Sequence, residues 1–446
     1  MAILYVRDEN TRKVIDVFED FNSLVWTERY QEAGEFVLDV SVTSENVDLF
    51  RRGRYLSLDD SEETMVITTV NITESYGDEE EPSLEISGKS VTSLLDRRIN
   101  SSKIINYHQG GIPYSGTFSS VISSIFSDEI SNPKQSTWEW FHQDDDGTWV
   151  EGFDGAQSVY DHKIKAVIRD APERKIDNFI FINKISSEQD VSVNETYTKI
   201  MNVYDLIVSL CRKYLMGFRV IINSSNNFEL QVYSGTDRTT NQKTLSPVIF
   251  DPIMDNISYV NYFEDDTDFK NYIFPYTNGY ITFAYENDIT ATVEIFPGYS
   301  WDHVGESATG IDRREIAFDG SSEVDSTEDY EIDKEYTVDG ETIEITAWQV
   351  LLHTLEKKLI LYGREQYEDG DYEIVTTSEG SIDPLVRYKY GVDYFMGDRV
   401  DITNANGIVM TGIIDEVVKS YDSNGILTTP NFKNMAEYDW GEEETE

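Results

Sequence analysis

The residue types that most often bind metals or act as nucleophiles are scarce in this chain. It contains one cysteine, Cys211, and five histidines. The histidines are His108, His142, His162, His303 and His353. Zinc ligands usually come in closely spaced pairs of cysteines or histidines. No histidine of this chain has that spacing from another histidine or from Cys211. The sequence therefore predicts no metal site, and no motif in it points to a cofactor.

Cys211 is also a poor candidate for a nucleophile. A reactive cysteine needs solvent exposure and a basic neighbour that stabilises the thiolate. Cys211 instead falls on the apolar side of a helix predicted over residues 198–216. We expect it to be a small core residue.

The acidic segment Asp144–Asp145–Asp146, followed by Gly147, has the look of a calcium-binding loop. A calcium loop of that type places its glycine sixth, between a first and a twelfth oxygen ligand. With Gly147 sixth, those two positions would be His142 and Phe153, and neither offers a carboxylate. The segment is predicted to be a polar turn. The chain also has no serine-hydrolase elbow, zinc-protease helix or phosphate-binding loop, and Gly88–Lys89 lacks the upstream glycine of the last of these.

Carboxylates are abundant, with 84 acidic residues against 36 basic ones and a net charge of −48. Such a charge argues against simple electrostatic binding of nucleic acid or anionic membrane. Glycoside hydrolysis needs two positioned carboxylates, but with so many acids no single pair stands out. The densest block, residues 319–344, contains one lysine, Lys334. It is typical of a solvated loop with short polar strands; the alternative is a charged surface facing a channel or a metal ion.

Two arginine doublets, Arg97–Arg98 and Arg313–Arg314, are isolated from other basic residues. We expect each to make local salt bridges. The N-terminal residues 1–8 have no features of a signal peptide, and no window is long and apolar enough to span a membrane. We therefore expect a chain without membrane insertion, made in a cytoplasm.

The elements that would position these residues begin with a series of short strands. Residues 1–100 alternate between apolar runs and polar turns, which is typical of an antiparallel barrel or sandwich. Strands are predicted over residues 3–7, 13–18, 23–30, 34–40, 55–58, 65–72 and 84–86, followed by a short helix over 90–98. This segment is the predicted first β-barrel.

Residues 101–244 are predicted to form a mixed α/β domain. Helical spacing of apolar residues occurs at 118–126 and again over 198–216, where Gly217 would end the helix. The stripe of the second helix comprises Ile200, Tyr204, Ile207, Cys211 and Tyr214. Strands are predicted to follow at 218–222 and 228–233.

The rest of the chain returns to strands. Residues 245–312 and 370–436 are predicted to form a split second β-barrel around an insertion, 313–369, that contains the acidic block and a helix. This helix, at 346–367, has the stripe Trp348, Leu351, Leu352, Leu355, Leu359 and Tyr362. Residues 437–446 are predicted to be a disordered acidic tail. The expected fold class is β-rich α+β, with two antiparallel barrels and mixed α/β insertions.

One internal similarity bears on this division. Residues 53–58 and 397–402 each begin with a glycine and continue as a strand, and each is followed by a second strand at 65–70 or 410–414. The similarity has two interpretations: any two β-hairpins look alike, or the barrel is duplicated, with one copy near each end of the chain.

Five groups of residues, in this order, carry a resemblance to a known family. They are Trp26–Tyr30 with Gly34–Leu38; Met65–Ile67 with Leu84–Ser90 and Leu94–Ile99; Phe228–Leu230 with Tyr233–Thr239; Gly310–Glu315; and Tyr390–Val400. Together these segments resemble the tail-hub proteins of long-tailed bacteriophages, which include baseplate hubs and the N-terminal part of tail-associated lysins. The resemblance covers roughly residues 20–420.

The resemblance implies a structural protein of the virion tail tip, assembled in the host cytoplasm, and not an enzyme. It implies a homotrimer whose six barrels join a six-fold tail tube to a three-fold spike or fibre and let DNA pass without specific binding. The implied partners are a distal tail protein ring, a tape-measure protein and a separate spike, fibre or receptor-binding protein.

Two other classes of function stay open on the residues alone. A carbohydrate-binding β-protein would need exposed tryptophans, and Trp138, Trp140 and Trp149 are the candidates. An acidic glycoside hydrolase would need a cleft with two carboxylates at a fixed separation.

Overall fold

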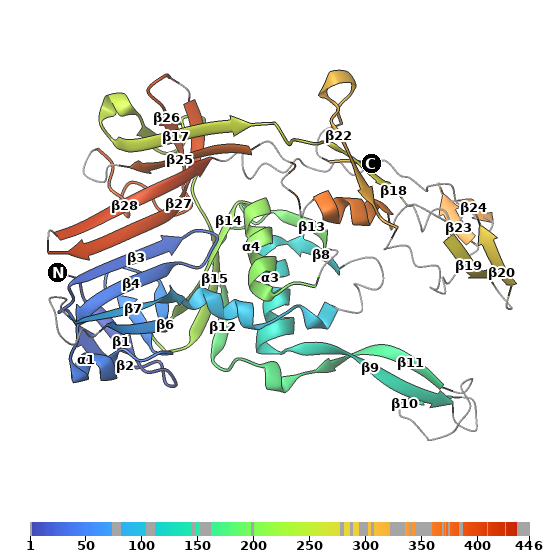
Figure 1. The fold of residues 1–446 in the computed structure, drawn as a ribbon, viewed down its shortest axis with the longest axis horizontal. Coiled ribbons are helices and arrows are strands. Elements are labelled where there is room, and N and C mark those ends of the chain that lie inside the picture. The colour runs from blue at the N-terminus through green and yellow to red at the C-terminus, as the bar shows by residue number, and fades with distance from the viewer. Residues whose placement is uncertain are drawn as a thin grey trace. The chain divides into compact units, whose positions relative to one another are not determined.

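The computed structural model describes most of the chain (Figure 1). The described residues are 2–73, 82–103, 112–143, 148–151, 162–197, 200–276, 281–285, 289–293, 302–304, 307–321, 335–338, 341–344, 359–367, 370, 372, 375–382, 387–407, 409–423 and 425–434. They form two compact units: residues before Phe263 together with those after Thr376, and the segment between them.

The first unit contains a module of seven N-terminal strands. They are β1 (Leu4–Arg7), β2 (Val14–Phe18), β3 (Ser23–Arg29), β4 (Glu35–Ser41), β5 (Tyr55–Leu58), β6 (Thr64–Thr73) and β7 (Ser83–Ser90), with helix α1 (Ser44–Leu49) after β4. Their order in the sheet is β3-β4-β7-β6-β5-β1-β2, and all these neighbours are antiparallel. Alternate residues of β4 and β7 are buried, because successive side chains of a strand point to opposite faces. The predicted meander is present with small shifts in its strand ends.

A second module comes from the C-terminal part of the unit. Its strands are β16 (Ile249–Phe250), β17 (Ile257–Asp265), β25 (Val375–Ile382), β26 (Arg399–Thr403), β27 (Val409–Asp422) and β28 (Gly425–Asn434). They follow the order β17-β25-β28-β27-β26-β16. A separate core that includes Phe250, Tyr394 and Phe432 lies within it. The two modules thus have different hydrophobic centres.

The modules join through one strand pair. Strand β27 pairs with β3 in antiparallel register from Glu416 opposite Arg29 to Tyr421 opposite Leu24. Figure 1 shows the two modules side by side at this pair. The pair joins them into one continuous sheet, which has thirteen strands among the described residues. Among the described strands the sheet is open, with β17 and β2 at its ends, and no closed barrel is found. The large antiparallel sheet agrees with the predicted β-rich class, whereas the two closed barrels are not confirmed.

The two modules share a strand order. Read from one end, β3-β4-β7-β6-β5 corresponds to β17-β25-β28-β27-β26. The glycine of each predicted repeat, Gly53 or Gly397, has a positive φ of 94° or 83°. Gly53 donates to the Ile67 carbonyl at 2.8 Å, and Gly397 donates to the Ile414 carbonyl at the same distance. A β-bulge follows directly in both copies, between Ile67 and Thr69 in β6 and between Ile414 and Glu416 in β27. These shared details favour duplication over a chance likeness of hairpins.

Between the modules, the same unit contains a mixed α/β region. Its elements are β8 (Ile112–Thr117), α3 (Phe118–Phe126), β9 (Lys134–Gln143), β10 (Trp149–Glu151), β11 (His162–Asp170), β12 (Phe179–Asn183), β13 (Ser192–Tyr197), α4 (Val203–Lys213), β14 (Met216–Ile222) and β15 (Phe228–Ser234). Short helical turns lie at Val91–Arg97, Ser101–Lys103, Ser127–Ser131 and Pro172–Arg174. Helices α3 and α4 bury their apolar sides in one core with β14 and β15.

The predicted end of the second helix is wrong. Helix α4 starts after Asn202, whose side chain accepts a hydrogen bond from the Asp205 amide, and it ends at Lys213. Leu215 then takes a left-handed φ of 55°, which stops the helix before any glycine. Gly217 lies inside β14, where a Cβ would come within 2.2 Å of the Tyr30 ring. The glycine is needed for close packing and not as a helix stop.

The second unit has its own small sheets. Strand β18 (Tyr272–Tyr276) lies between β21 (Asp302–His303) and β22 (Glu315–Asp319), and the hairpins β19–β20 and β23–β24 are separate. The hairpin strands are Ile281–Tyr285, Ile289–Val293, Glu335–Val338 and Glu341–Glu344. Residues 359–367 are helical and bury Leu359. The rest of the predicted helix 346–367, including Trp348, Leu352 and Leu355, lies outside the described residues, as does the predicted tail.

Within the described residues, no helix is both long and apolar enough to cross a membrane.

Candidate functional site

Cys211 is where the sequence places it. It lies on α4, is fully buried, and desolvation raises the pKa of its thiol well above the usual value. A thiolate is therefore disfavoured at this position. The prediction of a core cysteine is in keeping with this geometry.

The histidines do not form a metal site in the described part of the chain. His142 and His162 are opposite each other on β9 and β11, a pairing that their separation in sequence does not reveal. His303 is on β21, more than half exposed and 3.9 Å from Asp302. No group of three or more candidate ligands occurs among the described residues. His108 and His353 lie outside those residues.

Several other predicted features fall wholly or partly outside the described residues. The turn Asp144–Gly147 is outside them, as is most of the acidic block 319–344. Trp138 and Trp140 lie on β9 and Trp149 lies on β10, with their side chains outside the description. The carbohydrate-binding alternative thus stays a prediction.

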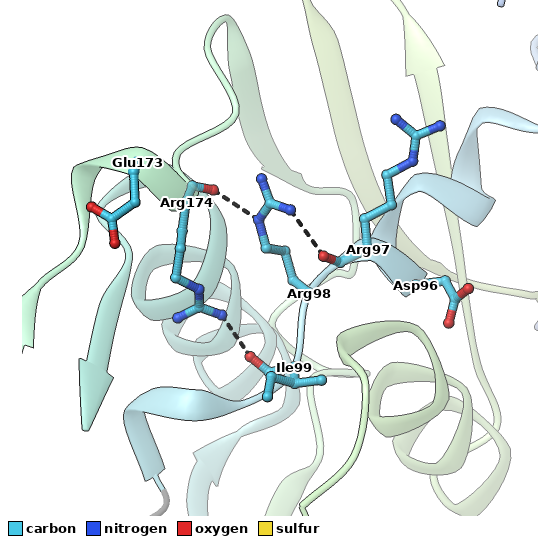
Figure 2. A pocket seen from close by; sticks show the side chains of 6 residues that line it. All are labelled: Asp96, Arg97, Arg98, Ile99, Glu173 and Arg174. Atoms are coloured by element: carbon cyan, nitrogen blue, oxygen red, sulfur yellow. Dashed lines mark hydrogen bonds between the residues drawn. The ribbon is translucent and has the colours of Figure 1, made fainter. Parts of the chain in front are cut away.

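The two arginine doublets differ in their surroundings. Arg313 pairs with Glu315 and Arg314 with Asp266, as expected for local salt bridges. Arg98 instead donates to two backbone carbonyls, those of Arg97 and Arg174. Figure 2 shows these residues around an open surface cavity of about 250 Å³, which Asp96, Ile99 and Glu173 complete. Burial and the neighbouring guanidinium groups of Arg174 and Arg97 lower the pKa of Arg98.

Arg174, which lines this cavity, makes several polar contacts with residues 99–134. Its guanidinium group contacts Glu129 at 2.9 Å and donates to the carbonyl oxygens of Ile99 and Lys134. Glu129 is almost completely buried, and desolvation raises the pKa of its carboxyl group despite this pairing. Buried charges of this kind need such partners. The residues lining the cavity include no nucleophile, and we assign it no catalysis.

The most constrained place in the first unit is centred on Tyr30, directly after β3. Its hydroxyl donates to the Leu215 carbonyl at 3.0 Å and accepts from the Gly235 amide at 3.1 Å. Its own amide donates to the Asp415 carbonyl in β27 at 2.8 Å. The side chain is fully buried, and desolvation raises the pKa of the phenol. One residue thus connects the N-terminal module, the mixed region and the C-terminal module. We call this place the Tyr30 junction.

Glycines let the backbone come close around the Tyr30 ring. A Cβ on Gly397 would lie 2.3 Å from the ring, and a Cβ on Gly235 would lie 1.7 Å from the Gly397 carbonyl oxygen. Tyr233 packs edge-on against Tyr30, with ring centroids 5.5 Å apart. Side chains at either glycine would displace these neighbours, so the junction depends on their absence.

A buried carboxylate fixes the segment after β15 to the turn before β26. Asp398 accepts from the Thr236 amide at 2.8 Å, from the Phe395 amide at 3.0 Å and from Arg238 Nε at 2.6 Å. Its side chain is 3% exposed. Charge-assisted bonds to a desolvated carboxylate are among the strongest in proteins. Asp398 therefore locks the mixed region onto the second module.

Charged residues also lie under the β27–β3 pair. Lys419 on β27 is nearly buried; its Nζ lies 2.8 Å from Glu28 Oε1 and donates to the Asp60 carbonyl at 2.6 Å. Tyr421 donates from its hydroxyl to the Asp60 carboxylate at 2.8 Å. The sheet joint is therefore held by side chains as well as by its backbone ladder.

Glu63 lies next to this cluster and is 3% exposed. One of its carboxylate oxygens, Oε2, has no hydrogen-bond partner among the described residues. Desolvation is the main cause that raises the pKa of Glu63 well above its ordinary value, and the nearby negative charge of Glu28 raises it further. We expect Glu63 to be protonated over part of the pH range in which other carboxylates are ionised.

Three of the five resemblance segments meet at the Tyr30 junction. These are Trp26–Tyr30, Tyr233–Thr239 and Tyr390–Val400. The sequence offered each as a separate run of turn and strand residues, with no sign that they touch. The first segment is more than 200 residues from the second and more than 350 from the third, so no local pattern indicates that they touch. The only sign in the sequence is that all three occur in one chain. The site that these residues build is one of packing and backbone hydrogen bonds.

Comparison with protein families gives one match that spans nearly the whole chain. Residues 3–432 match the family described as Siphovirus ReqiPepy6 Gp37-like protein. No curated protein matches the sequence.

Solved structures of similar fold include three tail proteins, each at a TM-score below 0.5. The prophage MuSo2 43 kDa tail protein from Shewanella oneidensis has 10% identity and a TM-score of 0.44, with 98% of this chain and 99% of that chain covered. The prophage tail protein gp18 from Listeria monocytogenes has 13% identity and a TM-score of 0.41, with 97% and 94% covered. The tail protein from Neisseria meningitidis has 10% identity and a TM-score of 0.43, with 98% of each chain covered.

The family match spans nearly the whole chain, including every segment that carries the resemblance. The resemblance to proteins of long-tailed bacteriophages is thus confirmed at the level of the family. This protein belongs to the family described as Siphovirus ReqiPepy6 Gp37-like protein.

Proposed function

We propose that this protein is a structural hub of the tail tip or baseplate. Three copies form a ring that joins the six-fold tail tube to a distal spike, fibre or receptor-binding protein. The ring also contacts a distal tail protein ring and the tape-measure protein, and DNA passes through it without specific binding. The chain acts by assembly and not by catalysis.

The observation that carries this proposal is the duplicated sheet module. Two modules with the same strand order, glycine turn and bulge lie in one chain and are joined edge to edge. A ring of three such chains presents six similar modules. It can therefore match six-fold symmetry on one side while keeping three-fold symmetry on the other. A trimer of chains with a single module each would present only three modules and could not match a six-fold partner in this way.

The sheet face that lies opposite the cores suits a channel wall. Asp39 and Glu85 are paired across β4 and β7 on this face, and Ser23 of β3 is paired with Asp39. The next row contains Val25 and Val37, both partly exposed and uncharged. Carboxylates on a channel wall repel DNA over about 8 Å at physiological salt. The proposed lumen would let a polyanion through without holding it.

Two measurements test the proposal. Light scattering on the purified chain should give three times the 51.2 kDa mass, with concentration-dependent dissociation. Gold-labelled antibody against the chain should mark the distal end of the tail of intact virions in negative-stain micrographs. A stable monomer, or label along the tail shaft only, would reject the hub role.

Absence of catalysis is tested separately. Purified protein should release no reducing sugar from polysaccharide and no soluble fragments from peptidoglycan. Turnover that one carboxylate substitution abolishes in a still-folded chain would replace the structural role with that of a hydrolase.

A further inference from the structure

The duplicated strands β6 and β27 have different neighbours beyond their bulges. Before the bulge, β6 pairs with β5, and β27 pairs with β26. Beyond the bulge, β27 pairs with β28 on one side and with β3 on the other. The matching half of β6, Thr69–Thr73, pairs with β7 on one side. Its other edge has no strand beside it in the described part of the chain.

Burial follows this difference. In β27, residues 416–421 alternate between half-buried and buried, because β3 covers that edge. In β6, residues 68–73 are exposed except for the half-buried Val70. Ile72, the counterpart of the buried Lys419 by distance from the bulge, is 42% exposed. Among the described residues of the single chain, the duplicated half-strand therefore lacks the covering strand that β27 has.

The counterpart of β3 also has an open edge. Strand β17 takes the place of β3 in the second module, next to β25, and it ends the thirteen-stranded sheet as described. The Tyr259 carbonyl closely approaches Gly380 of β25, and the Ser258 hydroxyl donates to the Ser381 carbonyl at 2.9 Å. Tyr259 is 52% exposed. The edge of β17 that corresponds to the β27-facing edge of β3 has no strand beside it in the described residues.

We infer that β6 of one copy, beyond its bulge, pairs in antiparallel register with β17 of a second copy. The intermolecular pair would repeat the β27–β3 pair that joins the modules within one chain. This inference rests on the proposed trimeric hub and names the surface that closes it. Around the ring, six similar joints would alternate between intramolecular and intermolecular.

The chemistry of the two edges fits a second copy of this chain. A closed ring needs two different, complementary surfaces on each subunit, and the two open edges supply them. Residues 68–73 are Thr-Thr-Val-Asn-Ile-Thr, and residues 257–263 are Ile-Ser-Tyr-Val-Asn-Tyr-Phe. Neither segment has a charge in a chain with 27% charged residues and a net charge of −48. Two such acidic chains can approach here without placing like charges face to face.

Crosslinking between two variants, each with one introduced cysteine, tests the pairing directly. Ile72→Cys and Tyr259→Cys are purified separately, and Cys211 stays unreactive in both because it is buried. A short flexible bis-maleimide added to the 1:1 mixture should produce a dimer band. Either variant alone should yield at most a background band. The double variant should give a covalent trimer.

Charge substitution provides the second test. Ile72→Lys and Tyr259→Lys should each reduce the trimer fraction at least tenfold at the concentration where the unchanged chain is half assembled. Val17→Lys is the matched control, because Val17 is 51% exposed on β2 at an edge outside the proposed joint. Circular dichroism and the melting temperature, measured at a concentration where all three variants are monomeric, should be the same for all three, since each position is exposed in the single chain.

The outcomes separate this inference from the proposed function. A trimer that forms normally with Ile72→Lys and Tyr259→Lys, and gives no mixed crosslink, rejects the β6–β17 pair and leaves the hub role standing. An unchanged chain that stays monomeric at every concentration rejects both. Equal crosslinking within each single variant would indicate a two-fold contact and would also reject the inference.

Discussion

Gly53 and Gly397 occupy the same place in the two modules but face different surroundings. Both have a positive φ, and both donate to the carbonyl just before the bulge of the next strand. A Cβ on Gly53 would meet only Glu9 at 3.9 Å, whereas one on Gly397 would lie 2.3 Å from the Tyr30 ring. The duplicated backbone thus keeps its hydrogen bonds, while the neighbours of each copy decide how much a change costs.

The largest contrast is expected between Lys419 and its counterpart Ile72. Lys419→Met should cost about 3–5 kcal/mol of unfolding free energy, because it leaves the Glu28 charge buried without its cation. Ile72→Met should stay within about 0.5 kcal/mol, since Ile72 is exposed in the single chain. Urea unfolding followed by tryptophan fluorescence measures both. Equal changes in unfolding free energy would mean that the β27–β3 pair contributes no more to stability at Lys419 than the open edge of β6 does at Ile72.

The glycine pair gives the next contrast. Gly53→Ala should cost about 1–2 kcal/mol from the left-handed backbone alone. Gly397→Ala carries the same penalty plus about 1–3 kcal/mol of overpacking against Tyr30. The difference between the two melting temperatures, measured side by side, isolates the packing part. If Gly53→Ala lowered the melting temperature as much as Gly397→Ala, packing against Tyr30 would not add to the constraint at Gly397.

Tyr30→Phe sharpens the role of the junction without a change in shape. The substitution removes the hydroxyl that bridges the Leu215 carbonyl and the Gly235 amide. An unsatisfied buried group costs about 1–3 kcal/mol, so we expect a loss in that range. Hydrogen exchange should increase at the Gly235 amide more than at amides within β4. Unchanged exchange at Gly235 would show that this bond contributes little.

The smallest effect is a pH dependence at Glu63. The pKa of Glu63 is raised in the folded chain, so its ionisation favours the unfolded state once the pH exceeds the ordinary value of 4.5. Glu63→Gln removes this penalty. The variant should gain stability relative to the unchanged chain as pH rises from about 4.5, and the gain should level off above the folded pKa. Melting curves across this range measure it; a constant difference at every pH would show that the Glu63 pKa is not raised.

The local patterns were enough to place many elements. Alternation in residues 34–40 predicted β4, and apolar spacing at Phe118, Val121 and Phe126 predicted α3. The predicted helix end at Gly217 was wrong, because Leu215 ends the helix by taking a conformation that leucine rarely adopts. Spacing rules favour glycine for that role, so they assigned Gly217 to the helix and not to packing.

The long-range contacts were beyond local patterns. The repeat of Gly53 and Gly397 was visible in the sequence, but its bulges and hydrogen bonds needed strand register to appear. The Tyr30 junction depends on which distant backbone segments approach, and periodicity has no information on that. The cavity beside Arg98 was missed for the same reason, since Arg174 comes from another part of the chain.

The two strands of the β27–β3 pair are synthesised at very different times. Arg29 and Glu416, which form an ion pair across it, are 387 residues apart in sequence. At translation rates of about 5–20 residues per second, β3 emerges roughly 20–80 s before its partner exists. For that interval the N-terminal module presents β3 with a bare edge, which other nascent chains could occupy. The order of synthesis therefore delays the β27–β3 pair, and with it the joined sheet, until the chain is nearly complete.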